Sequence, residues 1–282
     1  MRTSVGGHRV TTRAMSKVFW ASLPIRSPYL GTLDQVHQHL RPRTYVEVGV
    51  SKGTSLTLVL PGTTAIGIDP AADVRYPLRS GTRIFHEPSD EFFERHDLRA
   101  LLGDRLLDLA FIDGMHLFEF ALRDFMHLER FAHPETTILI HDCYPISEET
   151  ATRERQTPFW SGDIWRLIVC LKEWRPELKI NVVDVFPTGL GVITGLDPNS
   201  RVLDEHYDEI VRRAINIPYE YFAQEGKDQV LSRVPSDWSS VRRLLPARAF
   251  RADPLQLLPA RRAASSWVSK AASSMPRPAA VT

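Results

Sequence analysis

The chain has 282 residues, of which 43% are hydrophobic and 24% charged, and its formal net charge is +1. This length can bury one sizeable α/β core with appendages, and the near-neutral charge argues against a general polyanion-binding protein. Cys143 and Cys170 lack metal-knuckle spacing and are too few for a disulfide scaffold, so a reducing compartment is expected.

The N-terminal residues 1–25 contain arginines but no apolar segment before a cleavage site, and we interpret them as a flexible tail and not as a signal peptide. Elsewhere no apolar stretch reaches the roughly 18 residues of a transmembrane helix. The sequence therefore predicts a soluble cytoplasmic protein without a membrane partner.

The main domain is predicted over residues 26–225, where short β-branched runs alternate with helical patterns. Strands are expected at 44–50, 64–69 and 83–86, followed by a helix that Ser89 or Asp90 caps and that ends at Leu102.

The second half of this domain continues the alternation. Residues 106–113 are apolar almost throughout, which is typical of a strand buried on both faces of a parallel sheet. The remaining expected elements are a helix at 117–131, a strand at 136–142, a long loop at 143–163, a helix at 164–174, and a closing hairpin of strands 181–186 and 191–194.

This order of elements predicts an α/β fold, a doubly wound and mostly parallel seven-stranded sheet of the Rossmann-like type that ends in an antiparallel hairpin. Ligands of such sheets bind at the carboxyl ends of the strands. Ordinary dinucleotide folds continue with parallel crossovers, whereas methyltransferases that use S-adenosylmethionine (SAM) commonly end in an antiparallel pair.

The C-terminal segment differs in composition, because residues 226–282 hold ten Lys/Arg against three Asp/Glu. We expect one amphipathic helix at 202–215 and then a basic Arg/Ala/Pro-rich extension that is partly disordered. It lacks a clear recognition helix, so nucleic acid is not an expected partner. Four leucines could dock on the body or on another chain of a homo-oligomer: Leu244, Leu245, Leu257 and Leu258.

A cofactor loop is predicted after the first strand, in Glu47-x-Gly49-x-x-x-Gly53-Thr54. Glycines permit a sharp strand-to-helix turn and close approach of a ligand, and the helix start offers free N–H groups to a carboxylate. Asp69 ends the next strand, where an acid can bind both ribose hydroxyls of a nucleoside. The third glycine of an NAD-binding loop is missing.

Four motifs resemble a bacterial class I SAM-dependent methyltransferase family: Val46-Glu-Val-Gly-Val-Ser-Lys-Gly-Thr-Ser-Leu56, Ile68-Asp69, Phe111-Ile-Asp-Gly-Met-His116 with Arg123-Asp124, and Ile138-Leu-Ile-His-Asp142. It is the small-molecule branch with macrocin-type sugar O-methyltransferases and cephalosporin-hydroxylase-like proteins, and the resemblance covers about residues 40–196.

The resemblance implies which residues hold SAM. Glu47, Gly49 and Gly53 would border its methionine part, with Ser51 and Thr54 in the same loop, and Asp69 would bind the ribose. The adenine would lie beside Ser89. There this chain reads Glu87-Pro-Ser89-Asp90, where the family often has Gly-Asp-Ser or Gly-Asp-Ala.

Candidate catalytic residues end the fourth and fifth strands. Asp113 and Asp142 should point into one crevice, with His116 three residues after Asp113. They could bind a divalent cation such as Mg²⁺ through Asp113 and Asp142, or use His116 as a general base. His141 could face the opposite side, because neighbours in a strand alternate. In metal-dependent relatives the position of Cys143 holds an acid or amide.

The loop 143–163 is expected to form a lid or substrate wall, with Trp160 either packing or facing the site. Asp163 is a candidate N-cap, and Arg123 and Asp124 are interpreted as a structural pair. Trp165 and Trp174 are expected in the core or an interface.

Three functions stay open. The first is O-methylation of a hydroxyl on a small-molecule acceptor, a sugar or natural-product glycoside, by a SAM-dependent methyltransferase. The second is an NAD-dependent sugar oxidoreductase, although no Tyr-x-x-x-Lys proton donor occurs. The third is a catalytically silent scaffold with the same fold, which the residues Pro88 and Cys143 would fit.

Overall fold

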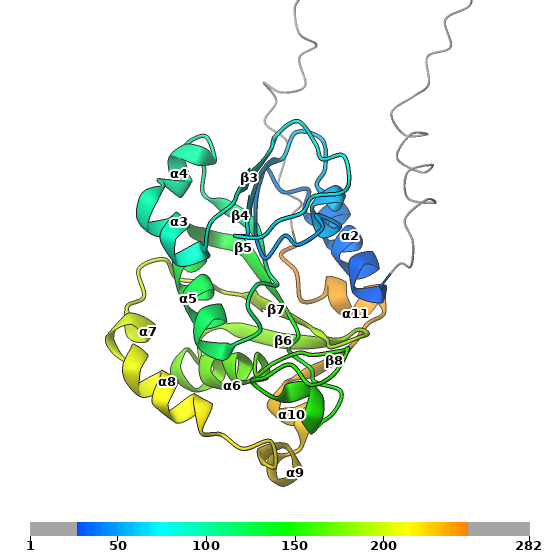
Figure 1. The fold of residues 1–282 in the computed structure, drawn as a ribbon, viewed down its shortest axis with the longest axis vertical. Coiled ribbons are helices and arrows are strands. Elements are labelled where there is room, and N and C mark those ends of the chain that lie inside the picture. The colour runs from blue at the N-terminus through cyan, green and yellow to red at the C-terminus, as the bar shows by residue number, and fades with distance from the viewer. Residues whose placement is uncertain (1–26, 248–282) are drawn as a thin grey trace, which may run out of the picture. The chain divides into compact units, whose positions relative to one another are not determined.

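Eight strands pair into one sheet in the computed structural model, which describes residues 27–247 (Figure 1). The order is β3-β2-β1-β4-β5-β7-β6-β8, and β7 runs antiparallel to both of its neighbours while the other pairs are parallel. The strands are β1 Thr44–Val48, β2 Thr64–Ile68, β3 Thr82–Phe85, β4 Leu107–Ile112, β5 Ala132–His141, β6 Lys179–Asp184, β7 Leu190–Thr194 and β8 Arg233–Pro235.

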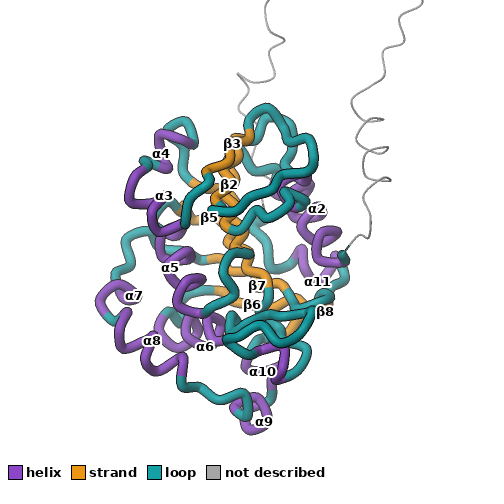
Figure 2. Tube along the Cα trace, in the orientation of Figure 1, coloured by secondary structure: helices purple, strands orange, loops and turns teal. Residues whose placement is uncertain are grey.

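Helices cover both faces of this sheet, as Figures 1 and 2 show. The helices are α2 Pro28–Leu40, α3 Ser89–Arg95, α4 Leu98–Leu101, α5 Phe118–Glu129, α6 Trp165–Trp174, α7 Val202–Glu205, α8 Tyr207–Ile215, α9 Tyr221–Glu225, α10 Lys227–Val230 and α11 Trp238–Arg242, with 3₁₀ turns η1 Ser55–Leu58 and η2 Glu148–Ala151. Helices α3 to α8 share one apolar core, and α2, η1 and α11 share the other.

The two cores arise from the alternation of side chains along the central strands. Val46 and Ala110 face the core of α3 to α8, whereas Tyr45 and Leu109 face the core of α2 and α11. All six residues of β4 are buried. The predicted strand with two buried faces is therefore confirmed, as is the mostly parallel α/β class with its antiparallel hairpin.

Three elements differ from the prediction. The sheet has an eighth strand, β8, which pairs with β6 beyond the seven expected strands. The helix predicted up to Leu102 is divided, because His96 is extended and Asp97 starts α4 by accepting a hydrogen bond from the Ala100 N–H. The helix predicted at 202–215 is divided at His206.

Residues 227–247 contribute to the core. Leu231 and Val241 are fully buried, and Leu245 is nearly so. Leu231 packs in the core of α3 to α8, and Val241 and Leu245 pack in the core of α2, so the packed region continues past residue 225. The expected tail 1–25 and Leu257 and Leu258 lie outside the described residues. No helix within 27–247 is long and apolar enough to cross a membrane.

Candidate active site

A cavity of about 720 Å³ opens at the carboxyl ends of the parallel strands, within the size range of small-molecule sites. Loops after β1 to β5 form its walls, as the doubly wound topology predicts. Of the predicted site residues, seven line this cavity: Gly49, Ser51, Asp69, Ser89, Asp113, His116 and Asp142.

The loop after β1 is fastened to β2 by Asp69. Its Oδ2 accepts hydrogen bonds from the backbone N–H groups of Val50 (2.8 Å) and Ser51 (2.7 Å), and Oδ1 accepts one from Ala71 (2.7 Å). These hydrogen bonds fix the backbone conformation of the loop. The Asp69 carboxylate also lines the cavity, so it both shapes the loop and faces the cavity.

Gly49 lies where the loop after β1 packs against the backbone of the loop after β4. Its φ is +90°, and an added Cβ would lie 2.0 Å from the backbone oxygen of Asp113. Only glycine fits this position, because a side chain would push the backbone of Asp113 away from the cavity.

We expect Gly49→Ala to lower the free energy of unfolding by roughly 2–5 kcal/mol, from backbone strain and from overpacking together. Urea denaturation measures the loss. Gly103→Ala is the matched control, because Gly103 also has a positive φ, +70°, but nothing within 4 Å of an added Cβ. Equal losses in the two variants would show that the contact with Asp113 has no energetic effect.

Glu47, Gly53 and Thr54 do not line the cavity, which differs from their expected place beside the cofactor. Glu47 is fully buried behind the loop, and it accepts hydrogen bonds from Tyr45 Oη (2.6 Å) and Ser55 Oγ (2.6 Å). Burial raises the pKa of Glu47 to about 8, although these two hydrogen bonds act to lower it. Its side chain supports the start of η1 from within.

This pKa predicts a pH dependence of stability. The pKa of Glu47 is higher in the folded chain, about 8, than its ordinary value of 4.5, so its stabilising contribution is complete below pH 4.5 and is lost as pH rises through 8. We expect Glu47→Gln to gain stability relative to the native chain between these limits. Denaturation at a series of pH values measures this, and parallel profiles for the two proteins would contradict it.

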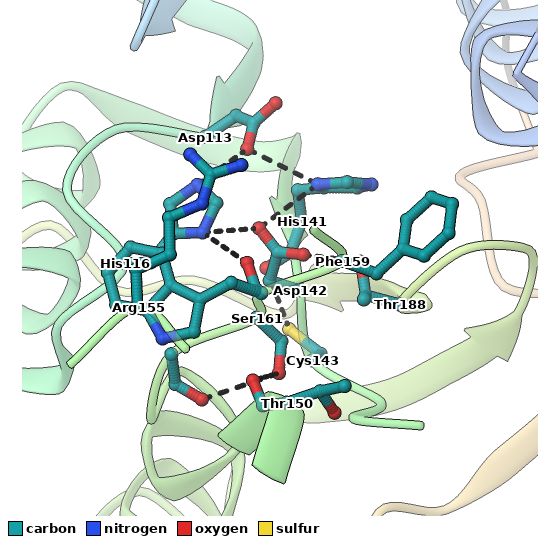
Figure 3. A network of polar contacts seen from close by, with 12 residues as sticks. Asp113, His116, His141, Asp142, Cys143, Thr150, Arg155, Phe159, Ser161 and Thr188 are labelled. Atoms are coloured by element: carbon teal, nitrogen blue, oxygen red, sulfur yellow. Dashed lines mark hydrogen bonds and ion pairs between the residues drawn. The ribbon is translucent and has the colours of Figure 1, made fainter. Parts of the chain in front are cut away.

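Two carboxylates and two imidazoles meet at the ends of β4 and β5 (Figure 3). His141 Nδ1 lies 3.2 Å from Asp113 Oδ1 and 3.2 Å from Asp142 Oδ2. His116 Nδ1 lies 3.2 Å from Asp142 Oδ2, and its Nε2 lies 3.6 Å from Asp113 Oδ1. Thr188 Oγ1 donates a hydrogen bond to the other oxygen of Asp142.

Opposite charges dominate the electrostatics of this cluster. Burial acts to raise the pKa of Asp113, but the charge of His141 and hydrogen bonds from His116 and His141 lower it to about 2. Burial acts to lower the pKa of both imidazoles, but Asp113 and Asp142 raise that of His116 to about 9 and that of His141 to about 10. Without a bound cation, Asp113 is therefore ionised and both imidazoles are protonated at neutral pH.

His141 thus faces the same site as Asp142, contrary to the alternation expected along a strand. The reason is local: β5 ends at His141, and Asp142 has a left-handed φ of +64°, which turns its side chain back toward the cavity. Cys143 is fully buried, with Sγ toward the backbone oxygens of Ile140 (3.3 Å) and His141 (3.6 Å). Burial raises the pKa of this thiol, and it lies outside the cavity wall.

The loop 143–163 forms one wall, as predicted. Trp160 stacks on His116 with ring centroids 5.1 Å apart, and its carbonyl accepts a hydrogen bond from His116 Nδ1 (2.8 Å). Arg155, Pro158 and Phe159 line the cavity beside it. Trp160 therefore fixes the orientation of the His116 ring.

Several structural interpretations are revised. Asp163 does not cap α6; it accepts a hydrogen bond from the Phe118 N–H at the start of α5 (2.7 Å) and pairs with Arg153 and Arg166. Arg123 pairs with Asp90 (2.9 Å) and not with Asp124. Trp165 lies in the core, as expected, and Trp174 contacts His206.

Residues 46–143 match the family model of a methyltransferase domain. No curated protein matches the chain. The matched segment runs from β1 to the end of β5, and the topology of the sheet agrees with the fold predicted from the sequence. This match does not distinguish the macrocin-type or cephalosporin-hydroxylase-like subtype, which stays a prediction.

Similar solved structures include several O-methyltransferases. A putative O-methyltransferase from Klebsiella pneumoniae is 14% identical, with 68% of this chain and 92% of that chain covered and a TM-score of 0.45. TomG from Streptomyces achromogenes, in complex with SAM, is 12% identical (66% and 87% covered, TM-score 0.47). A putative caffeoyl-CoA O-methyltransferase from Staphylococcus aureus is 14% identical (65% and 90% covered, TM-score 0.45).

Proposed function

We propose that this chain transfers the methyl group of SAM to a hydroxyl group of a small molecule. The observation that carries the proposal is one continuous cavity, whose walls run from Ser51 and Asp69 at one side to Asp113, His116 and Asp142 at the other. A nucleoside-binding loop and an acid–imidazole cluster thus share one space.

The residues that line the cavity are suited to binding SAM. The cavity of about 720 Å³ can hold the cofactor and part of an acceptor. Asp69 stands at the end of β2, where a carboxylate can accept hydrogen bonds from ribose hydroxyls. When bound, SAM supplies an electrophilic methyl group on its sulfonium.

A divalent cation also fits the acid–imidazole cluster. Ligand atoms of Asp113, His141 and Asp142 lie within 4.8 Å of one another. Carboxylate oxygens suit Mg²⁺, and the imidazole of His141, which would give up its proton to a bound cation, extends the set to Mn²⁺ and similar ions. A cation held there would supply Lewis-acid polarisation of the acceptor hydroxyl.

The chain's own residues would orient the acceptor. Both imidazoles contact Oδ1 of Asp113, so its Oδ2 can accept a hydrogen bond from an acceptor hydroxyl. His116 and His141 keep Asp113 ionised, and Trp160 holds His116 in place. An ionised Asp113 would draw the proton from the hydroxyl oxygen as that oxygen reacts.

The outer end of the cavity is apolar. Met115 and Phe159 line it and are 56% and 50% exposed, and Phe186, 54% exposed, contacts the Phe159 ring at 5.3 Å. Exposed rings at a cavity mouth favour an acceptor with an apolar face. A natural-product glycoside, which joins a sugar to an apolar aglycone, would suit this end.

The test is a metabolite screen with SAM carrying a labelled methyl group. We expect label to enter a small molecule at an oxygen atom, as mass spectrometry of the product would show. Transfer of label only to protein or nucleic acid would refute the proposed acceptor class.

A further inference from the structure

Asp124 on α5 is a buried carboxyl that the cluster around Asp113 does not use. Its side chain is 3% exposed and lines the cavity, and its Oδ1 has no hydrogen-bond partner among the described residues. Arg123 cannot neutralise it directly, because that guanidinium is bound to Asp90 and to Tyr207 Oη. A buried acceptor without a partner is costly, which suggests that a ligand satisfies it.

The surroundings of Asp124 indicate what that ligand offers. Ser89 donates a hydrogen bond to the Asp124 carboxyl, and Pro88 and Phe120 complete an apolar wall beside it. Burial raises the pKa of Asp124 to about 7, with an opposing effect of the Ser89 hydrogen bond. The site therefore combines flat apolar walls with one acceptor oxygen, which suits the edge of a planar ring that carries an N–H donor.

The place of Asp124 in the fold indicates which part of SAM would lie beside it. Asp69 ends β2, Ser89 follows β3, and β3 is the outer neighbour of β2 in the sheet. A nucleoside whose ribose contacts Asp69 can therefore extend its base toward Ser89 and Asp124, away from His141 and Asp142 at the end of β5. Of the polar groups of SAM, the exocyclic amino group of adenine is the N–H donor at the end of the molecule beyond the ribose.

We propose that Asp124 selects the adenine ring of SAM by accepting a hydrogen bond from its exocyclic amino group. This inference rests on the proposed function, since it assigns a residue to the cofactor of that reaction. Asp90, the carboxylate that follows β3 in the cavity wall, is bound to Arg123 (2.9 Å), so the acceptor left for the base is Asp124 on α5.

Calorimetric titration with two ligands tests the proposal: S-adenosylhomocysteine, and its inosine analogue, which carries a carbonyl oxygen in place of the amino group. We expect the native chain to bind the adenine compound about 10- to 100-fold more tightly, because the analogue would set an acceptor against the acceptor Asp124. Asp124→Asn can donate to that oxygen, so it should lose or reverse the preference. Asp97→Asn, which alters only the cap of α4, should retain it.

The outcomes are distinguishable. Equal affinity of the native chain for both ligands, or an unchanged preference in a folded Asp124→Asn variant, would overturn the role of Asp124. Should that variant fail to fold, the preference of the native chain alone decides the question. Binding of neither ligand by the native chain would instead refute the proposed function.

Discussion

Replacing Asp113 by asparagine is expected to lower kcat for methyl transfer by about 10²- to 10⁴-fold. The substitution keeps the shape of the side chain but removes the negative charge that faces both His116 and His141 and that would orient the acceptor hydroxyl. Single-turnover transfer of a labelled methyl group, with the acceptor identified by the screen, measures the loss.

Asp108→Asn is the matched control for this variant. Asp108 is a buried carboxylate on β4, the strand that ends just before Asp113, but it pairs with Arg43 (3.3 Å) and His133 (2.9 Å) outside the cavity. We expect its replacement to lower the melting temperature and to leave kcat near the native value. Native kcat in a folded Asp113→Asn variant would remove Asp113 from the chemistry.

Removing divalent cations is expected to reduce activity by at least about 100-fold, because Lewis-acid polarisation contributes several kcal/mol to such reactions. Protein treated with EDTA and dialysed, then checked by elemental analysis, should regain activity when Mg²⁺ or Mn²⁺ is added. We expect this cation dependence because ligand atoms of Asp113, His141 and Asp142 lie within 4.8 Å of one another, where they could hold one ion.

Two variants test which neighbours of Asp142 affect the binding of the cation. Thr188→Val removes the hydrogen bond to Asp142 and should weaken the apparent cation affinity by about 10- to 100-fold. Cys143→Ala should not change it, because Sγ points away from the cavity. Full activity in protein shown to be free of metal would contradict a cation requirement and leave the imidazoles and carboxylates to act alone.

The sheet was predictable wherever a strand is buried on both faces. The apolar run that becomes β4 can hardly be anything but a central strand, and the hairpin of β6 and β7 is marked by its turn. The three-residue strand Arg233–Pro235 carries no such pattern. Its conformation comes from pairing with β6, a tertiary contact that local propensity does not encode.

The convergence of Asp113 and Asp142 followed from topology, because the carboxyl ends of parallel strands meet at one edge. The contribution of His141 was missed, since alternation along a strand fails where Asp142 adopts a left-handed φ of +64°. Asp124 was taken for a partner of Arg123, although neighbours on a helix point in different directions. The face that each residue presents depends on how α5 packs, which one sequence does not specify.

Calorimetric titration of the native chain with S-adenosylhomocysteine and, separately, with NAD⁺ tests the central claim most directly. The loop after β1 and Asp69 predict one bound S-adenosylhomocysteine per chain and no heat with NAD⁺. Binding of NAD⁺ without S-adenosylhomocysteine would contradict the assignment of this cavity to SAM and would favour the oxidoreductase.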